Sequence, residues 1–262
     1  MGRAQALSAA LVAACGGGDR SAIDAGACAP DFATWTAHPA PIALAGDFAH
    51  PTFDRDRVIY DATGPSGKRV LFEQPLAGGG AATAIAALAS ATDDTIAPSL
   101  GPDGTLWFAR AGAVWRATPS DAAPARVELP LSGSIEPSSP GFVHGETRLV
   151  VAVASVLHEL ASADRTYWLE LPTALGGPAV DPYTSPDGCF VLFASDRAHT
   201  RDLYVAARGT DGVFGPAQLL AFASATDLDE FAPAMADPET LYFVSSAPGV
   251  PPTLMLATPQ SR

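Results

Sequence analysis

The sequence predicts an all-β fold, a β-propeller of five four-stranded blades, from its repeats and its turn residues. A unit of about 45 residues recurs along the chain, and each copy contains short β-rich runs separated by turns. Gly and Pro contribute 24 residues each to the 262, which indicates many turns. Hydrophobic residues make up 48% of the chain, so the units can bury a core between them.

The clearest copy of the unit spans residues 180–220. It contains four strand-like runs, which we place at 180–184, 190–194, 203–207 and 213–220. Pro186-Asp187-Gly188 separates the first two runs, and these residue types favour tight turns. We therefore expect the charged residues at and beside the turns to hold the turns rather than to perform chemistry.

Weaker copies align on a proline at the start of an apolar run: Pro51, Pro98, Pro137, Pro182 and Pro233. The spacings between these prolines are 47, 39, 45 and 51 residues, the size of a four-stranded propeller blade. Glu-Leu-Pro ends both the second unit (128–130) and the third (170–172), which supports the alignment. The third unit is the least regular, and it lacks the Pro-Asp-Gly turn.

The fifth unit has only three strands before the sequence ends at Arg262. Residues 32–44 resemble the run at 213–219, so we expect them to form the outer strand of the last blade. Pairing the two ends closes the ring and hides the strand edges that an open array would expose. Six blades are the alternative, if residues 76–92 or the third unit contain further strands.

Residues 1–14 have the pattern of a secretory signal, with one positive charge followed by a short apolar run and small residues. Val12-Ala13-Ala14-Cys15 resembles a bacterial lipobox, which implies that Cys15 carries a lipid and is the first mature residue. Residues 15–30 are predicted to be a flexible tether, and residues 31–262 a single propeller domain. The alternative is a chance cysteine after an ordinary start.

The other two cysteines, Cys28 and Cys189, can form a disulfide in an oxidising compartment or remain unpaired thiols. After the N-terminus no run of 18 or more apolar residues occurs, so the sequence predicts no spanning helix. We expect the protein at the bacterial cell envelope, on the periplasmic side or the surface of the outer membrane, attached by the N-terminal lipid only.

The best copy of the unit also resembles a known family. Ser185-Pro186-Asp187-Gly188, Phe193-Ala194-Ser195-Asp196-Arg197 and Asp202-Leu203-Tyr204 resemble the TolB-type, WD-like propeller repeat of bacterial envelope proteins. The resemblance implies the fold and an envelope location. TolB itself has a separate α/β domain, for which this chain has no room, so the resemblance does not imply the role or the partners of TolB.

The formal net charge of −13, with 15 Lys plus Arg, makes nucleic acid an unfavourable partner. The sequence contains no H-E-x-x-H, no G-x-S-x-G and no phosphate-binding loop. We therefore predict no metal centre of that type and no cofactor, apart from a divalent cation such as calcium in the channel. We expect a monomer.

Acidic residues recur near the innermost strand of each unit, where a propeller lines its central channel. With one histidine they form the candidate ligand-binding set at the channel mouth: His50, Asp54, Asp94, Glu136, Asp181, Asp229 and Glu230. Converging carboxylates can bind a divalent cation through oxygen ligands, or two of them can act as acid and base on a glycosidic bond. Duplication of a repeat would also give solvated or turn-capping acids at these positions.

The sequence favours a non-catalytic binding platform for an envelope protein, a peptide or a glycan, with docking at a channel mouth. The alternative is a glycoside hydrolase-like enzyme that uses channel carboxylates. That enzyme needs two carboxyl groups roughly 5–10 Å apart in a deep pocket, and a plugged channel would argue against it. A propeller with purely structural duty is the third alternative.

Overall fold

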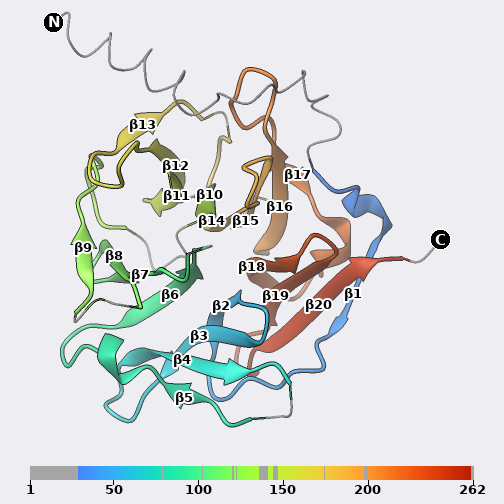
Figure 1. The fold of residues 1–262 in the computed structure, drawn as a ribbon. Coiled ribbons are helices and arrows are strands. Elements are labelled where there is room, and N and C mark those ends of the chain that lie inside the picture. The colour runs from blue at the N-terminus through green and yellow to red at the C-terminus, as the bar shows by residue number, and fades with distance from the viewer. Residues whose placement is uncertain are drawn as a thin grey trace, which may run out of the picture.

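The computed structural model describes residues 29–77, 80–101, 103–119, 121, 123–135, 141–143, 147–173, 175–197 and 200–260. The described chain forms five antiparallel sheets of four strands each, arranged as blades around a central axis (Figure 1). The predicted five-bladed propeller is therefore confirmed, and the six-bladed alternative is not the form that the chain adopts. Within the described residues, no helix has the length and hydrophobicity to cross a membrane.

Each blade is numbered along the chain and is written from the innermost strand outward. Blade 1 consists of β2 (Ala49–Phe53), β3 (Arg57–Thr63), β4 (Arg69–Pro75) and β5 (Thr83–Ala84). Blade 2 consists of β6 (Thr95–Leu100), β7 (Leu106–Arg110), β8 (Ala113–Ala117) and β9 (Ala125–Val127). Blade 3 consists of β10 (Gly141–Val143), β11 (Arg148–Val153), β12 (Val156–Ala161) and β13 (Leu169–Leu171).

Blade 4 consists of β14 (Val180–Thr184), β15 (Phe190–Ser195), β16 (Asp202–Ala207) and β17 (Gln218–Leu219). Blade 5 consists of β18 (Asp229–Asp237), β19 (Thr240–Ser246), β20 (Thr253–Pro259) and, outermost, β1 (Trp35–Pro39). In the described part of the chain, three short 3₁₀ turns lie outside the sheets, η1 (Phe32–Thr34), η2 (Ala86–Leu88) and η3 (Ala221–Ala223).

The N-terminal strand closes the ring, as predicted. β1 pairs with β20 in antiparallel register from Trp35 opposite Pro259 to Pro39 opposite Met255. The strand is shorter than the predicted 32–44, because η1 precedes it and the chain leaves the sheet after Pro39. The first and last described strands thus lie side by side on the rim (Figure 1).

Blade 3 departs most from the prediction. Its inner strand is β10 at Gly141–Val143, downstream of the predicted position at 135–138. Ile135 still forms a bridge with Val153, but residues 136–140, which include Glu136 and Pro137, lie outside the described residues. This unit lacks the Pro-Asp-Gly turn that marks the end of the inner strand in units two and four.

The repeated prolines mark β-bulges in the inner strands. In β2, β6, β14 and β18 the pairing shifts so that two residues oppose one on the neighbouring strand. Proline lacks an N–H to donate, so a bulge tolerates it. The residue before the proline has a positive φ in all four strands, 46° at His50, 54° at Ala97, 52° at Asp181 and 51° at Ala232.

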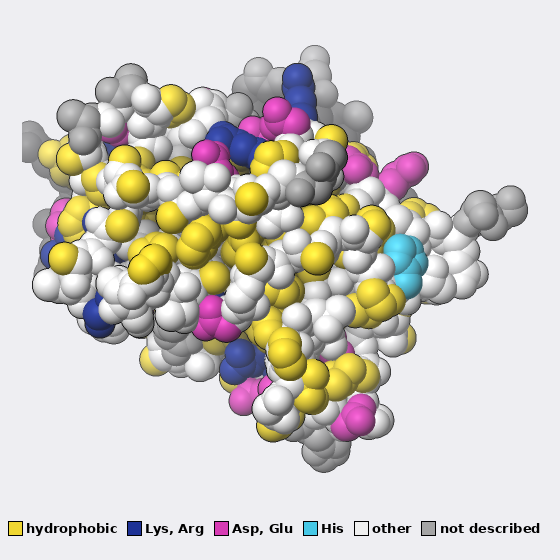
Figure 2. Space-filling model, turned by 90° about the horizontal axis from the view of Figure 1, so that it is seen from below, with side chains coloured by type: hydrophobic (Ala, Val, Ile, Leu, Met, Phe, Trp, Pro, Cys, Tyr) yellow, Lys and Arg dark blue, Asp and Glu magenta, His cyan; other side chains and the backbone are white. Residues whose placement is uncertain are grey.

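Apolar side chains fill the space between neighbouring blades. Trp107 and Trp168 are almost fully buried between blades 2 and 3 and meet edge to face, with ring centroids 6.3 Å apart. Phe53 and Tyr242 stack at 4.1 Å between blades 1 and 5. On the flank beside β4 and β5, hydrophobic side chains also reach the surface in a band that charged side chains border (Figure 2).

Candidate functional site

We name the two faces of the ring by the inner strands. The entry face is where the inner strands begin, and the exit face is where they end. The bulge residues His50 and Asp181 belong to β2 and β14 and lie near the entry face. Blades 1 and 4 are not neighbours in the ring, so a contact between these two residues spans the channel (Figure 1).

His50 makes that contact. Its Nε2 lies 3.4 Å from Asp181 Oδ1, and its Nδ1 lies 2.7 Å from Oδ1 of Asp61 on β3. The Asp61 side chain is fully buried, the Asp181 side chain is 4% exposed and His50 is 13% exposed. The histidine therefore sits between two carboxylates in the middle of the ring, and we call these three residues the His50 cluster.

The cluster is an ion-pair network. Burial alone would lower the pKa of His50, but Asp61 and Asp181 raise it to about 10 through their charges and hydrogen bonds. For Asp61 the effects are reversed. Burial alone would raise the pKa of its carboxyl group, but His50, Arg69 and the Ala97 N–H together hold that pKa below its usual value. At neutral pH His50 is an imidazolium, so both ring nitrogens carry a proton that they can donate to the carboxylates.

Asp61 is the centre of this network. Its Oδ1 accepts hydrogen bonds from His50 and, at 2.9 Å, from the Ala97 N–H at the bulge of blade 2. Its Oδ2 accepts from Arg69 Nε at 2.6 Å, and Arg69 also pairs with Asp47 at 2.9 Å. Both carboxylate oxygens thus accept from donors of three strands, β2, β4 and β6, so Asp61 ties these strands together.

Sequence reasoning missed Asp61 and Arg69. The signal was present, because Asp61 lies inside the apolar run from Val58 to Ala62, where a charge has to be buried and paired. A second such residue is Glu159, 2% exposed, which pairs with Arg148 at 2.9 Å and with Arg208 at 2.8 Å. This second network ties blade 3 to blade 4.

Two of the predicted acids link neighbouring blades. Asp94 Oδ1 accepts from the Arg69 backbone N–H at 2.9 Å, and Asp229 Oδ1 accepts from the Arg201 N–H at 3.1 Å. Asp94 directly precedes β6 and Asp229 is the first residue of β18, and each acid caps the start of the third strand of the blade before it. Their geometry is that of capping residues, the alternative that duplication suggested.

Asp54 is not brought together with the other candidates. It lies in the turn between β2 and β3, on the exit face, and accepts from the Arg55 N–H at 2.8 Å. Glu136 and the lipid-attachment candidate Cys15 lie outside the described residues. Cys189 is disulfide-bonded, but Cys28 also lies outside the described residues, so the Cys28–Cys189 pairing stays a prediction.

Glu230 is buried apart from the His50 cluster. Its side chain is 3% exposed, and Ser245 Oγ donates to its Oε1 at 3.3 Å. Burial and the charges of Asp202 and Asp229 raise the pKa of Glu230 to about 7, although hydrogen bonds from Ala225 and Ser245 oppose the shift. Asp202 is equally buried, and neither Asp202 Oδ1 nor Glu230 Oε2 has a partner within the described part of the chain.

No group of three or more His, Cys, Asp or Glu side chains among the described residues is placed to hold a metal ion. The candidate acids are instead distributed between the His50 cluster, the capping positions and the exit face. The calcium expectation therefore gains no ligand set from the described residues.

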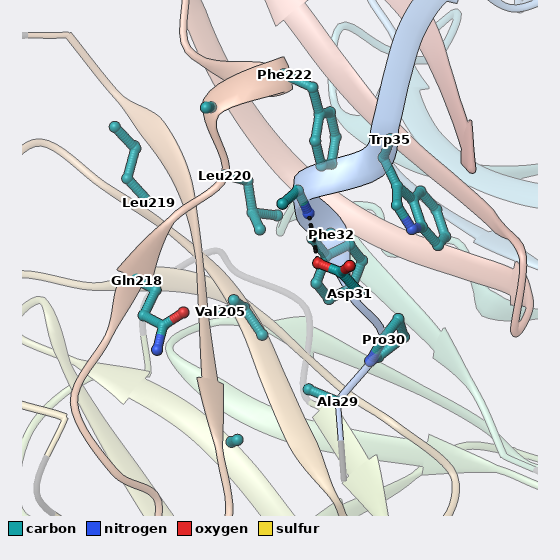
Figure 3. Close-up of a pocket in the computed structure, with 13 residues that line it drawn as sticks. Ala29, Pro30, Asp31, Phe32, Trp35, Val205, Gln218, Leu219, Leu220 and Phe222 are labelled. Carbon is teal, nitrogen blue, oxygen red and sulfur yellow. Dashed lines mark hydrogen bonds between the residues drawn. The ribbon is translucent and has the colours of Figure 1, made fainter. Parts of the chain in front are cut away.

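We consider three cavities that described residues line. One of about 360 Å³ opens on the entry face and is lined by Lys68, Asp93, Asp94 and Arg110 among others. Another of about 510 Å³ lies on the exit face between blades 4 and 5. The third, of about 290 Å³, lies on the rim between β17 and the segment that enters β1, with Phe32, Trp35 and Phe222 around it (Figure 3).

No protein-family model matches the sequence, and no curated protein matches it. Solved structures do match. TolB from Acinetobacter baumannii superposes with a TM-score of 0.54 at 13% identity, over 82% of this chain and 55% of that one. The chain thus spans about half of that TolB. The fold is that of a TolB-type β-propeller.

The same fold carries other activities. A gluconolactonase from Xanthomonas campestris superposes with a TM-score of 0.53 at 14% identity, over 83% of this chain and 73% of that one. An arabinanase from Bacillus subtilis superposes with a TM-score of 0.54 at 9% identity, over 82% of this chain and 94% of that one. At these identities the likeness shows the fold alone, so function has to be argued from the site.

Proposed function

We propose that this protein is a non-catalytic binding platform of the bacterial envelope, which docks a protein, a peptide or a glycan on a face of its propeller. One observation carries the proposal: His50 joins Asp61 to Asp181 across the axis of the ring. A ring locked in this way is a rigid support, and its binding surface lies on the faces rather than in the channel.

The hydrolase alternative lacks a comparable observation. A catalytic pair needs one carboxyl group to give a proton and another to act as base or nucleophile. In the His50 cluster both carboxylates are buried and bound to a cation, so neither faces a substrate-sized cavity. The arabinanase and gluconolactonase likeness supports only the fold and adds no catalytic residue to this chain.

The envelope location is part of the proposal and rests on the N-terminal signal pattern, on Cys15 and on the TolB-like fold. We expect Cys15→Ala to move the protein from the detergent phase to the aqueous phase in a phase-partitioning experiment. Cys28→Ala serves as the matched control and should leave the protein in the detergent phase. A wild-type protein that is found in the aqueous phase with residues 1–14 still attached would contradict the anchor.

Docking on a face is tested by photo-crosslinking in envelope fractions. A photoreactive residue is placed at Lys68 on the entry face, at Pro238 on the exit face, and at the exposed Thr83 on the outer strand β5 as control. We expect an adduct from one or both faces that is absent from Thr83. The proposal fails if none of the positions gives an adduct, or if Thr83 gives the same adducts as the faces.

A further inference from the structure

The exit-face cavity is the largest of the three, at about 510 Å³, which is within the usual range for small-ligand sites. Its inner wall is formed by Tyr183 and Phe190 of blade 4 and by Met235 of blade 5. Phe190 is buried, and Tyr183 and Met235 are half-buried. The cavity therefore offers an aromatic and thioether surface that a neighbouring blade completes.

The rim of this cavity is acidic. Asp187 and Asp237 lie in the equivalent first turns of blades 4 and 5, and both side chains are exposed. Asp187 Oδ1 accepts from Ser185 Oγ at 2.6 Å and from the Cys189 N–H at 3.0 Å, and Asp237 Oδ1 accepts from the Glu239 N–H at 2.9 Å. These bonds use Oδ1 of each carboxylate, and the described hydrogen bonds leave Oδ2 of Asp187 and of Asp237 unused.

No lysine or arginine is among the described residues that line the cavity. Burial raises the pKa of the Tyr183 hydroxyl, and the charge of Asp187 raises it further, so the Asp187 charge is felt at the inner wall. In a chain with a net charge of −13, this cavity combines an apolar interior with a rim that carries two carboxylates. Such a site favours a ligand with an apolar body and a positive charge.

We infer that the exit-face cavity binds an arginine side chain presented by a peptide segment of a partner protein. The aliphatic stem of arginine would lie along Met235 and the rim prolines Pro186 and Pro238. Its guanidinium carries five N–H donors, which can bond the carboxylate oxygens that the turns leave unused, and its plane stacks on aromatic rings such as Tyr183. This inference deepens the proposed function and rests on it, because it names the chemistry that the platform recognises.

The test is to titrate the full-length protein with the capped tripeptide acetyl-Leu-Arg-Leu-amide and to measure the affinity by isothermal titration calorimetry. The matched peptide carries citrulline, which has the shape of arginine without its charge. We expect the arginine peptide to bind at least about tenfold more tightly than the citrulline peptide. Raising the salt concentration from 0.05 to 0.5 M should lower the affinity for the arginine peptide only.

Asp187→Asn and Asp237→Asn keep an oxygen for the turn hydrogen bonds and remove the charge. Each substitution should lower the affinity for the arginine peptide by about threefold to tenfold. Asp211→Asn is the matched control, because Asp211 caps another exit-face turn through the Val213 N–H at 3.0 Å but does not line the cavity. It should leave the affinity unchanged.

Equal affinity for the two peptides, no saturation at millimolar arginine peptide, or an equal effect of Asp211→Asn would overturn the inference. The comparison of peptides uses the wild-type protein, so it does not depend on the folding of a variant. Failure here is separable from failure of the platform. If Lys68 crosslinks a partner and the arginine peptide does not bind, the platform stands and the exit-face inference falls.

Discussion

His50 holds the charge on which the channel entrance depends. A buried carboxylate is costly unless a cation and hydrogen bonds compensate it. Asp61 and Asp181 each meet His50, and Arg69 supplies a second cation to Asp61, so the two buried carboxylates of the cluster face two positive charges. The network is balanced only while the imidazole is protonated, which makes the stability of the ring dependent on pH.

That dependence can be measured. Burial lowers the pKa of His50, but the two carboxylates raise it from 6.5 to about 10. The stabilisation is therefore complete below about pH 6.5 and is lost as the pH rises toward 10, with a slope of up to about 1.4 kcal/mol per pH unit. Urea unfolding at pH 6, 8 and 10 should show this fall in the wild type and not in His50→Asn. The exposed His38→Asn is the control and should keep the wild-type slope.

Asp61 should be the most sensitive single residue of the cluster. Asp61→Asn leaves His50 and Arg69 without their shared buried counter-charge, so we expect a loss of about 3 kcal/mol in the free energy of unfolding. Asp47→Asn removes the other carboxylate that pairs with Arg69, at a side chain that is 54% exposed, and should cost less than about 1 kcal/mol. Equal losses in the two variants would show that burial does not govern the network.

The sequence located part of this cluster and not the rest. The repeat places His50 and Asp181 at the residue before an aligned proline, which is why both could be predicted to face the channel. Asp61 is different, because the equivalent positions in blades 2, 4 and 5 hold Ala109, Ala194 and Val244. A charged residue that occurs in only one copy of the repeat cannot be found by comparing the copies. Its partners become visible only in the folded ring.

At the scale of the element, turns were the most predictable feature and strand ends the least. Pro186-Asp187-Gly188 forms the predicted turn, with Gly188 at a φ of 73°. The outer strands were predicted too long: residues 213–220 contain only the two-residue β17. Outer strands have one neighbour and few buried side chains, so hydrophobic pattern constrains them weakly.

In two hairpins, the residue at the first loop position does not suit the backbone conformation of the turn. The two-residue loops after β7 and β11 hold Ala111 at a φ of 50°, followed by Gly112, and Ala154 at a φ of 50°, followed by Ser155. Turns of this shape favour asparagine at the first position, since alanine is strained at positive φ.

We expect Ala111→Asn and Ala154→Asn each to stabilise the fold by about 0.5–1 kcal/mol in thermal and urea unfolding. Ala125→Asn is the control, on the exposed extended strand β9, where asparagine gains nothing from the turn and is a poor strand former. Stabilisation by all three substitutions would point to a surface effect rather than to relief of the turn.

At the scale of the molecule, closure is the property that makes the blades one domain. Each blade buries its faces against two neighbours, and blade 5 is complete only when β1 adds to β20. Trp35 of β1 is 5% exposed and packs with Phe222 of η3, the turn that follows blade 4, their rings stacked at 6.2 Å (Figure 3). The pairing of β1 with β20 therefore completes blade 5 and closes the ring, which the strands between them cannot do alone.

This arrangement predicts which rearrangements of the chain are tolerated. Trp35 lies opposite Pro259, and the Gln260 N–H donates to the Thr34 carbonyl at 2.9 Å, so the two ends are already in hairpin geometry. A circular permutant that runs from residue 46 to 260 and then, through a short Gly-rich linker, from 31 to 45 should keep the fold.

The matched truncation lacks residues 31–45 altogether, and all chains carry Cys189→Ser so that thiol chemistry does not contribute. The permutant should have a melting temperature, measured by circular dichroism, within a few degrees of that of the parent, the chain with its strands in the natural order. The reason is that the permutant keeps every strand pair of blade 5. The truncation should lose cooperative melting or aggregate through the exposed edge of β20. If the truncation melts like the parent, closure by β1 is not what stabilises the ring. If the permutant fails while the parent folds, the order in which the strands are made matters as well as their pairing.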